Sequence, residues 1–190
     1  MLSSPLLLCH VIAGGLALLV GLLPVAFRFR PSWHIRTGYT YIALMGTSTL
    51  LGLYLSLASG RTFLFVISVF TLLMMLIGWR AVRRGYGPAQ WADWLTLALL
   101  VGTGVWFISY LNVIMAVFGG LCLAGAAQLL VHLRQPGRRW WVPIHVGYLL
   151  GSYISAVTAF LVNVISFGAV TWIAPTVIGT VLITLLIRQA

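Results

Sequence analysis

Seven long apolar runs follow one another along the chain, separated by short links. They cover residues 5–27, 38–58, 62–79, 92–110, 113–133, 141–166 and 169–187. Each run is close to the roughly 20 residues that a helix needs to cross the hydrocarbon layer of a membrane. Only 6% of the residues are charged, whereas a soluble domain carries about 25%. The sequence therefore predicts an all-α, polytopic transmembrane helical bundle that forms a single integral-membrane domain over residues 1–190.

The number of helices depends on residues 92–133, which contain no strong helix breaker. As a single helix this stretch would be about 63 Å long, twice the roughly 30 Å thickness of the hydrocarbon layer. We therefore expect a hairpin near Asn112 and seven membrane helices. Without this turn the chain would have six.

Arginine is distributed unevenly between the two ends of the expected helices. The links after the first, third and fifth runs are rich in arginine and Arg188 follows the seventh, whereas the opposite side has only Arg61. The positive-inside rule then places the N-terminus outside and the C-terminus in the cytoplasm. The net charge of +10 is thus typical of membrane topology and does not indicate nucleic acid. We expect a multi-pass protein of the bacterial inner membrane, in contact with membrane lipid.

The ionisable side chains exclude several kinds of chemistry. All basic residues are arginine, so the chain cannot form a lysine Schiff base or a P-loop. Asp93 is the only carboxylate, which excludes a catalytic acid pair, a carboxylate cage for Mg²⁺ or Ca²⁺, and a carboxylate proton relay. Asp93 stands where it complements the dipole of the fourth helix, and we expect its partner among Arg80–Arg84. Catalysis would have to use histidine or a bound cofactor, and the sequence leaves open whether the chain is an enzyme.

Four histidines are the main candidates for chemistry. His34 lies in the link before the second expected helix, His132 at the inner end of the fifth, and His145 about one turn into the sixth. These three share the predicted cytoplasmic side, whereas His10 lies in the outer part of the first helix. An interfacial histidine can also simply anchor a helix end, and His132 fits this structural role well.

Two kinds of cofactor suit these histidines. Two imidazoles from different helices can bind the iron of haem b from opposite sides, and we expect His145 with His34 in this role. Arginines can pair with the haem propionates, and the candidates here are Arg36, Arg138 and Arg139. Converging imidazoles can instead bind Zn²⁺ or Cu²⁺. The candidate ligands for such a metal are His10, His34, His132 and His145.

Three segments also carry a resemblance to a known family. They are H-x-x-x-G-G-L-A-L-L-x-G over residues 10–21, H-I-R-T-G-Y-T-Y over 34–41, and H-V-G-Y-L-L-G-S-Y-I-S-A-V-T-A-F-L-V-N over 145–163. With these segments the chain resembles the domain-of-unknown-function 2306 family of small predicted bacterial membrane proteins. The resemblance implies an all-helical membrane architecture and matches His10, His34 and His145, but not His132, to the recurrent histidines of the family. It implies no substrate.

Three functions remain open from the sequence. The first is electron transfer between a haem b or metal centre near the cytoplasmic face and a membrane quinone or a partner protein. The second is a non-catalytic membrane subunit or assembly factor, for which a respiratory or assembly protein is a candidate partner. The third is a small-solute transporter, for which Ser152, Ser155 and Asn163 would supply the polar route. A homodimer is an alternative use of the G-x-x-x-G motif at Gly147 and Gly151.

Overall fold

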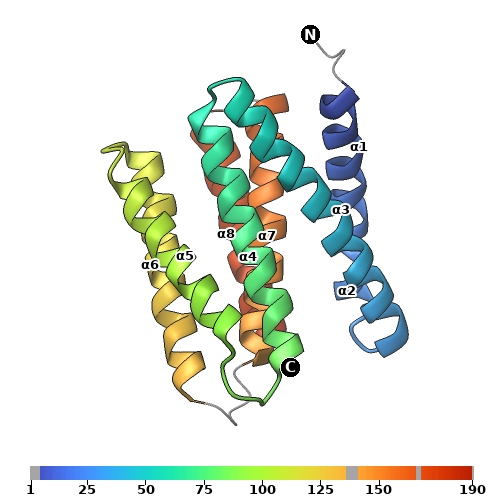
Figure 1. Cartoon of the computed structure of the whole chain (residues 1–190). Helices are drawn as coiled ribbons and strands as arrows, with labels where there is room; N and C mark the ends of the chain where they lie inside the picture. Colours follow the sequence, from blue (N-terminus) through green and yellow to red (C-terminus); the bar gives the residue numbers. More distant parts are fainter. Residues whose placement is uncertain (1–4, 136–140, 166–167, 190) are drawn as a thin grey trace. The chain divides into compact units, whose positions relative to one another are not determined.

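The computed structural model describes residues 5–135, 141–165 and 168–189. Within these residues the chain forms eight helices and no strand (Figure 1). They are α1 (Pro5–Val20), α2 (Leu23–Ala26), α3 (Pro31–Ala58), α4 (Thr62–Arg84), α5 (Trp91–Ile108), α6 (Val113–Arg134), α7 (Trp141–Val164) and α8 (Ala169–Arg188). Counting α1 and α2 together, seven helical segments of the described chain are long and apolar enough to cross a membrane. The predicted all-α architecture with seven helices is confirmed.

The hairpin between α5 and α6 lies where the sequence predicts it. Helix α5 ends at Ile108 and α6 begins at Val113. Leu111 has a φ of 52°, in the left-handed region, and this conformation reverses the chain direction. The side chain of Asn112 then caps α6 by accepting a hydrogen bond of 2.9 Å from the backbone N–H of Ile114. Because of this turn, residues 92–133 form parts of two helices and not of one, and the number of membrane helices is seven and not six.

Helix α3 begins earlier than the sequence analysis predicts. It starts at Pro31, so the predicted link before residue 38 is wrong, and His34 and Arg36 lie in the first turns of a helix. The physical reason is that polar residues end an apolar run without ending a helix, and that proline suits the first helical turn. With 28 residues, α3 is about 42 Å long, which exceeds the roughly 30 Å hydrocarbon layer. Helix α4 likewise continues past residue 79, to Arg84.

The chain divides into two compact units. The first unit contains Met1–Leu72 and Tyr153–Thr176, and the second contains Leu73–Ser152 and Val177–Ala190. Because α4, α7 and α8 contribute residues to both units, the sequence does not separate them into two consecutive domains. The single membrane domain and the orientation of the termini stay predictions.

In the first unit, α1 and α3 lie side by side (Figure 1). The C-terminal part of α7 contacts α1 through Tyr153, whose hydroxyl donates a hydrogen bond of 3.0 Å to the carbonyl of Leu18. It contacts α4 through the hydroxyls of Thr71 and Ser155, which are 2.7 Å apart. Hydrogen bonds made by side-chain hydroxyls therefore connect the helix segments of this unit, as is common between helices in membranes.

In the second unit, glycines allow close contact between helix backbones. A Cβ atom on Gly119 of α6 would lie 2.7 Å from the carbonyl oxygen of Gly104 on α5. A Cβ atom on Gly78 of α4 would lie 2.9 Å from the backbone nitrogen of Leu149 on α7. No side chain fits at these two points, because both contacts are made with backbone atoms that cannot rotate away. Glycine therefore sets how closely α5 approaches α6 and α4 approaches α7.

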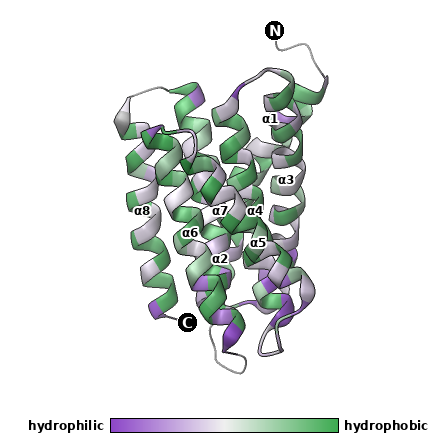
Figure 2. Ribbon diagram, turned by 60° about the vertical axis from the view of Figure 1, so that its left-hand side comes forward, coloured by the Kyte–Doolittle hydropathy of each residue, from purple (hydrophilic) through white to green (hydrophobic). Residues whose placement is uncertain are grey.

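The helix surfaces are strongly apolar. Figure 2 shows hydrophobic residues along the lengths of the helices, with the hydrophilic residues mainly near the helix ends. Large apolar side chains are exposed on several helices, among them Leu19, Val113 and Ile178. Exposed apolar surface of this extent is stable only in contact with lipid. The chain is therefore a multi-pass membrane protein that contacts membrane lipid.

Candidate functional site

The only carboxylate of the chain lies at the N-terminus of α5. The backbone N–H of Gln90, the N-cap residue, donates a hydrogen bond of 2.9 Å to Oδ2 of Asp93. This bond satisfies one of the backbone N–H groups left without a helical partner, and the negative charge complements the helix dipole. The side chain of Asp93 is only 5% exposed, so its charge also needs a partner within the protein.

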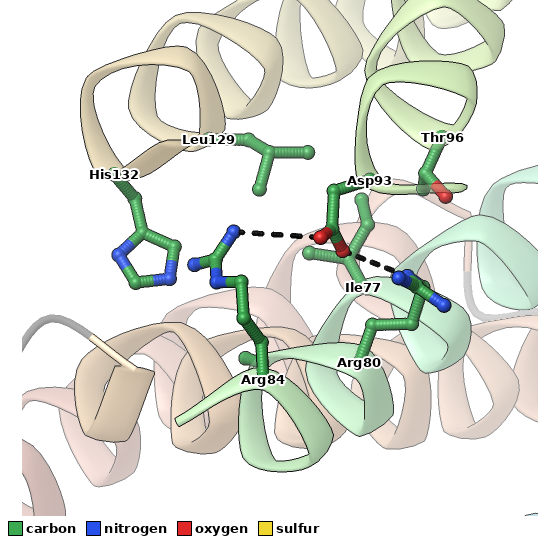
Figure 3. A pocket seen from close by; sticks show the side chains of 8 residues that line it. Ile77, Arg80, Arg84, Asp93, Thr96, Leu129 and His132 are labelled. Carbon is green, nitrogen blue, oxygen red and sulfur yellow. Dashed lines mark hydrogen bonds and ion pairs between the residues drawn. The ribbon is translucent and has the colours of Figure 1, made fainter. Parts of the chain in front are cut away.

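Two arginines from the end of α4 supply this partner (Figure 3). Nε of Arg80 donates a hydrogen bond of 2.7 Å to Oδ1 of Asp93, and Nη1 of Arg84 lies 3.9 Å from Oδ2. The prediction that Asp93 pairs with an arginine from Arg80–Arg84 is confirmed. Two guanidinium groups and one carboxylate leave this cluster with a net positive charge.

His132 on α6 faces the same cluster. The side chain of Arg84 lies between the imidazole of His132 and the carboxylate of Asp93 (Figure 3). His132 is 5% exposed, and within the described part of the chain neither of its ring nitrogens has a hydrogen-bond partner. The three helices enclose a cavity of about 10 Å³ here. It is lined by Arg80, Arg84, Asp93 and His132, together with Ile77, Ala81, Thr96 and Leu129. His132 lies at the end of α6 as predicted, but its unsatisfied nitrogens had no signal in the sequence.

The two histidines of the first unit each contact a backbone carbonyl. Nδ1 of His10 lies 2.8 Å from the carbonyl oxygen of Ser48 on α3. Nδ1 of His34 lies 2.9 Å from the carbonyl oxygen of Pro24, in the last turn of α2. A carbonyl in the last turn of a helix lacks an intrahelical partner. His34 therefore supplies a donor that the short helix α2 would otherwise lack.

In the second unit His145 on α7 makes the same kind of contact. Its Nδ1 lies 3.1 Å from the carbonyl oxygen of Gly78 on α4. Because a carbonyl oxygen only accepts hydrogen bonds, Nδ1 carries the proton in His145, and the same holds for His10 and His34. The neutral ring then has its lone pair on Nε2, the nitrogen that can bind a metal or haem iron. These three histidines share one tautomer, and His132 is not held in this way.

The predicted ligand sets have different outcomes. Across the described residues, no group of three or more His, Cys, Asp or Glu side chains is arranged to hold a metal ion. The haem pair His34 and His145 stays a prediction, because one residue belongs to the first unit and the other to the second. Arg36 is exposed on α3. Arg138 and Arg139 lie outside the described residues.

Of the polar residues proposed for a transport route, Ser155 contacts the hydroxyl of Thr71 on α4, whereas Ser152 and Asn163 make hydrogen bonds within α7. The hydroxyl of Ser152 donates to the carbonyl of Leu149, and the side-chain amide of Asn163 donates to the carbonyl of Ala159. Each of these bonds lies within α7 itself. Hydrogen bonding within a helix is an ordinary structural use of such residues, so these contacts give a transport route no further support.

Comparison with models of protein families, with curated protein sequences and with solved protein structures gave no match to the chain. The resemblance to the domain-of-unknown-function 2306 family therefore stays a prediction. The seven apolar helices define the class, a multi-pass membrane protein. Any more specific function has to be argued from its own side chains.

Proposed function

We propose that this protein of the bacterial inner membrane binds a haem b or a metal ion through Nε2 of its carbonyl-bound histidines, and that it exchanges electrons with a membrane quinone or a partner protein. The supporting observation is that His10, His34 and His145 each place Nδ1 against a backbone carbonyl oxygen, from which we infer one shared tautomer. In each of them Nδ1 lies between 2.8 and 3.1 Å from a backbone carbonyl oxygen.

This arrangement is the one that metal-binding histidines use. A histidine ligand usually donates its second ring N–H to a carbonyl or carboxylate, which fixes the tautomer, orients the ring and makes the ligating nitrogen more basic. Ionisable side chains are also rare inside membrane helices unless they have a function. The donor chemistry of the three rings therefore fits a haem or metal, whereas His132 lacks the orienting bond.

The side chains of the protein have separate tasks in this proposal. A haem or redox-active metal, when bound, would supply reversible one-electron chemistry. The Gly78 carbonyl holds the proton of His145 on Nδ1 and so keeps Nε2 in the basic form. We propose Arg36, Arg138 and Arg139 as partners for anionic groups such as haem propionates, because arginine binds carboxylates through two parallel hydrogen bonds.

The test is an absorbance spectrum and a metal analysis of the full chain, purified in detergent from cells supplied with a haem precursor. We expect a Soret band or a stoichiometric metal. The His145→Asn variant keeps an N–H donor close to the position of Nδ1 and removes Nε2. It should lose the bound group or change its ligation while the protein stays folded. The same change at His34 and at His10 shows which of them are ligands.

The matched control is His132→Asn, which removes a histidine that lacks the carbonyl bond and should leave the spectrum unchanged. Wild-type protein that is colourless and free of metal would contradict the proposal. The non-catalytic membrane subunit or assembly factor would then be the better interpretation, above all if the protein purifies with a larger complex.

A further inference from the structure

The cluster at the ends of α4, α5 and α6 contains more positive charge and more hydrogen-bond donors than its own acceptors can satisfy. Each oxygen of Asp93 already accepts one hydrogen bond, Oδ1 from Arg80 and Oδ2 from the backbone N–H of Gln90. Arg84 is 3.9 Å from Oδ2, which is beyond hydrogen-bond distance. Arg84 therefore has an ion pair with Asp93 but no hydrogen bond to it.

The burial of this charge is the first argument for a ligand. The side chain of Arg84 is only 5% exposed, and the one carboxylate is shared with Arg80. A buried charge is destabilising unless it is both paired and hydrogen-bonded. The surplus charge of the cluster is positive, so an anion stabilises it and a cation does not.

His132 is the second, independent argument. A neutral imidazole has one N–H donor and one lone pair, and both nitrogens of His132 are buried without a partner in the described residues. The ring faces Arg84 across the cavity (Figure 3). Thr96 also lines the cavity, but its hydroxyl already donates to the carbonyl of Ala92 at 2.7 Å. The groups that remain for a ligand are thus the N–H donors of His132 and Arg84.

The size of the cavity limits the occupant. A volume of about 10 Å³ holds roughly one water-sized particle. A chloride ion is larger than a water molecule, so the flexible side chain of Arg84 has to shift to admit it, but phosphate, sulfate or a lipid headgroup would need far more room than the cavity offers. We propose that this cavity is a binding site for one monatomic anion, chloride under cellular conditions, held between the guanidinium of Arg84 and the imidazole N–H of His132.

The proposal is tested on the full-length protein with bromide as the probe, because bromide resembles chloride and scatters X-rays anomalously. Crystals grown in bromide should show an anomalous peak between Arg84 and His132. In detergent, the thermal midpoint should be several degrees higher in sodium chloride or bromide than in sodium gluconate at equal ionic strength. The chloride concentration that gives half of this shift measures the affinity.

Two variants separate anion binding from general stability. His132→Phe keeps a ring of similar size and removes the N–H, so it should fold and weaken halide binding at least tenfold. Thr96→Val changes the lining of the same cavity but removes only a hydroxyl that already donates to the carbonyl of Ala92, so its halide dependence should match the wild type. Equal midpoints in chloride and gluconate, or crystals in bromide with only a water molecule in the cavity, would overturn the proposal.

Discussion

The helix pairs α1 with α3 and α5 with α6 each consist of two long apolar helices that lie side by side, but different groups join them (Figure 1). Between α1 and α3 the contact includes hydrogen bonds, beside close packing of Gly14 against Ser48 and of Gly52 against His10. Nδ1 of His10 meets the carbonyl of Ser48, and the hydroxyl of Ser48 donates to the carbonyl of His10 at 3.2 Å. Between α5 and α6 the backbones approach closely at Gly104 and Gly119, where Leu123 and Ile108 also pack.

The two pairs show two ways in which helices associate in membrane lipid, which is as apolar as the helix side chains. Because lipid removes most of the hydrophobic drive between helices, they associate through close packing or through hydrogen bonds. Glycine packing places no chemically active group at the contact. The hydrogen-bonded pair orients an imidazole. In the second unit, Asp93 of α5 and His132 of α6 lie near the ends of their helices, away from Gly104 and Gly119.

The largest effect on stability is expected at the start of α5. Asp93→Asn keeps the shape of the side chain but leaves Arg80 and Arg84 without a counter-charge. Removal of one partner from a buried ion pair costs about 3 kcal/mol or more. The measurement is the free energy of unfolding in a detergent titration. Gln90→Ala removes the 3.3 Å hydrogen bond from Arg80 and the contribution of the Gln90 side chain to the capping box, but leaves the ion pair in place, and should be milder. Equal stability of Asp93→Asn and wild type would show that the ion pair is not needed.

The next effect is expected at the contact between α5 and α6. Gly119→Ala places a Cβ atom 2.7 Å from the Gly104 carbonyl oxygen, so the helices must separate, at a cost of about 1 to 3 kcal/mol. Gly120→Ala is the matched control, because a Cβ atom there would meet no other atom within 4 Å. It should be neutral or slightly stabilising, since alanine favours helix. If Gly119→Ala and Gly120→Ala unfold at the same temperature, close backbone packing at Gly119 does not stabilise the contact between α5 and α6.

A smaller effect is expected at the turn that joins these two helices. Asn112→Ala removes the side-chain oxygen that accepts from the N–H of Ile114. Loss of such a cap costs about 1 kcal/mol. Asn112→Asp retains the acceptor and should restore most of the stability in thermal unfolding. No rescue by aspartate would mean that the cap contributes little to the hairpin.

The smallest effect is expected at the polar contact between α1 and α3. Ser48→Ala removes a hydroxyl that bonds to the carbonyl of His10, while the Ser48 carbonyl still accepts from Nδ1. Hydrogen bonds between membrane helices contribute about 0.6 kcal/mol on average. Ser59→Ala, whose hydroxyl bonds within α3 to the carbonyl of Leu55, is the control. If Ser48→Ala lowers the free energy of unfolding as much as Gly119→Ala does, the expected order of these effects is wrong.

Most of the fold could be predicted from the sequence because membrane helices have a simple physical requirement. Each apolar run is long enough for one membrane helix, so the number of runs predicts the number of helices. Residues 92–133 are too long for one membrane helix, which requires the turn that precedes α6 at Asn112. The start of α3 was not predictable from hydropathy, because hydropathy marks where the chain leaves the lipid and not where the helix begins. Pro31 was the available signal.

In the candidate site, only the ion pair of Asp93 could be predicted, because the sequence contains a single side-chain carboxylate. A single carboxylate next to an arginine-rich link had to pair with an arginine, and Asp93 does pair with Arg80. The unsatisfied nitrogens of His132 depend on how α6 packs against α4, which no residue pattern in the sequence reports. The carbonyl partners of His10, His34 and His145 are backbone atoms, so residue type carries no signal for them.

The pairing of Asp93 with two arginines has a consequence for the protein as a whole. The chain has eleven arginines and no second side-chain carboxylate, so the counter-charge for the arginines outside this cluster must come from outside the polypeptide side chains. At a membrane surface the nearest anions are lipid phosphates, which attract arginine next to the bilayer. The bilayer is in this sense a counterion reservoir for the folded chain. A free energy of unfolding measured for this protein therefore belongs to a stated lipid composition as much as to the sequence.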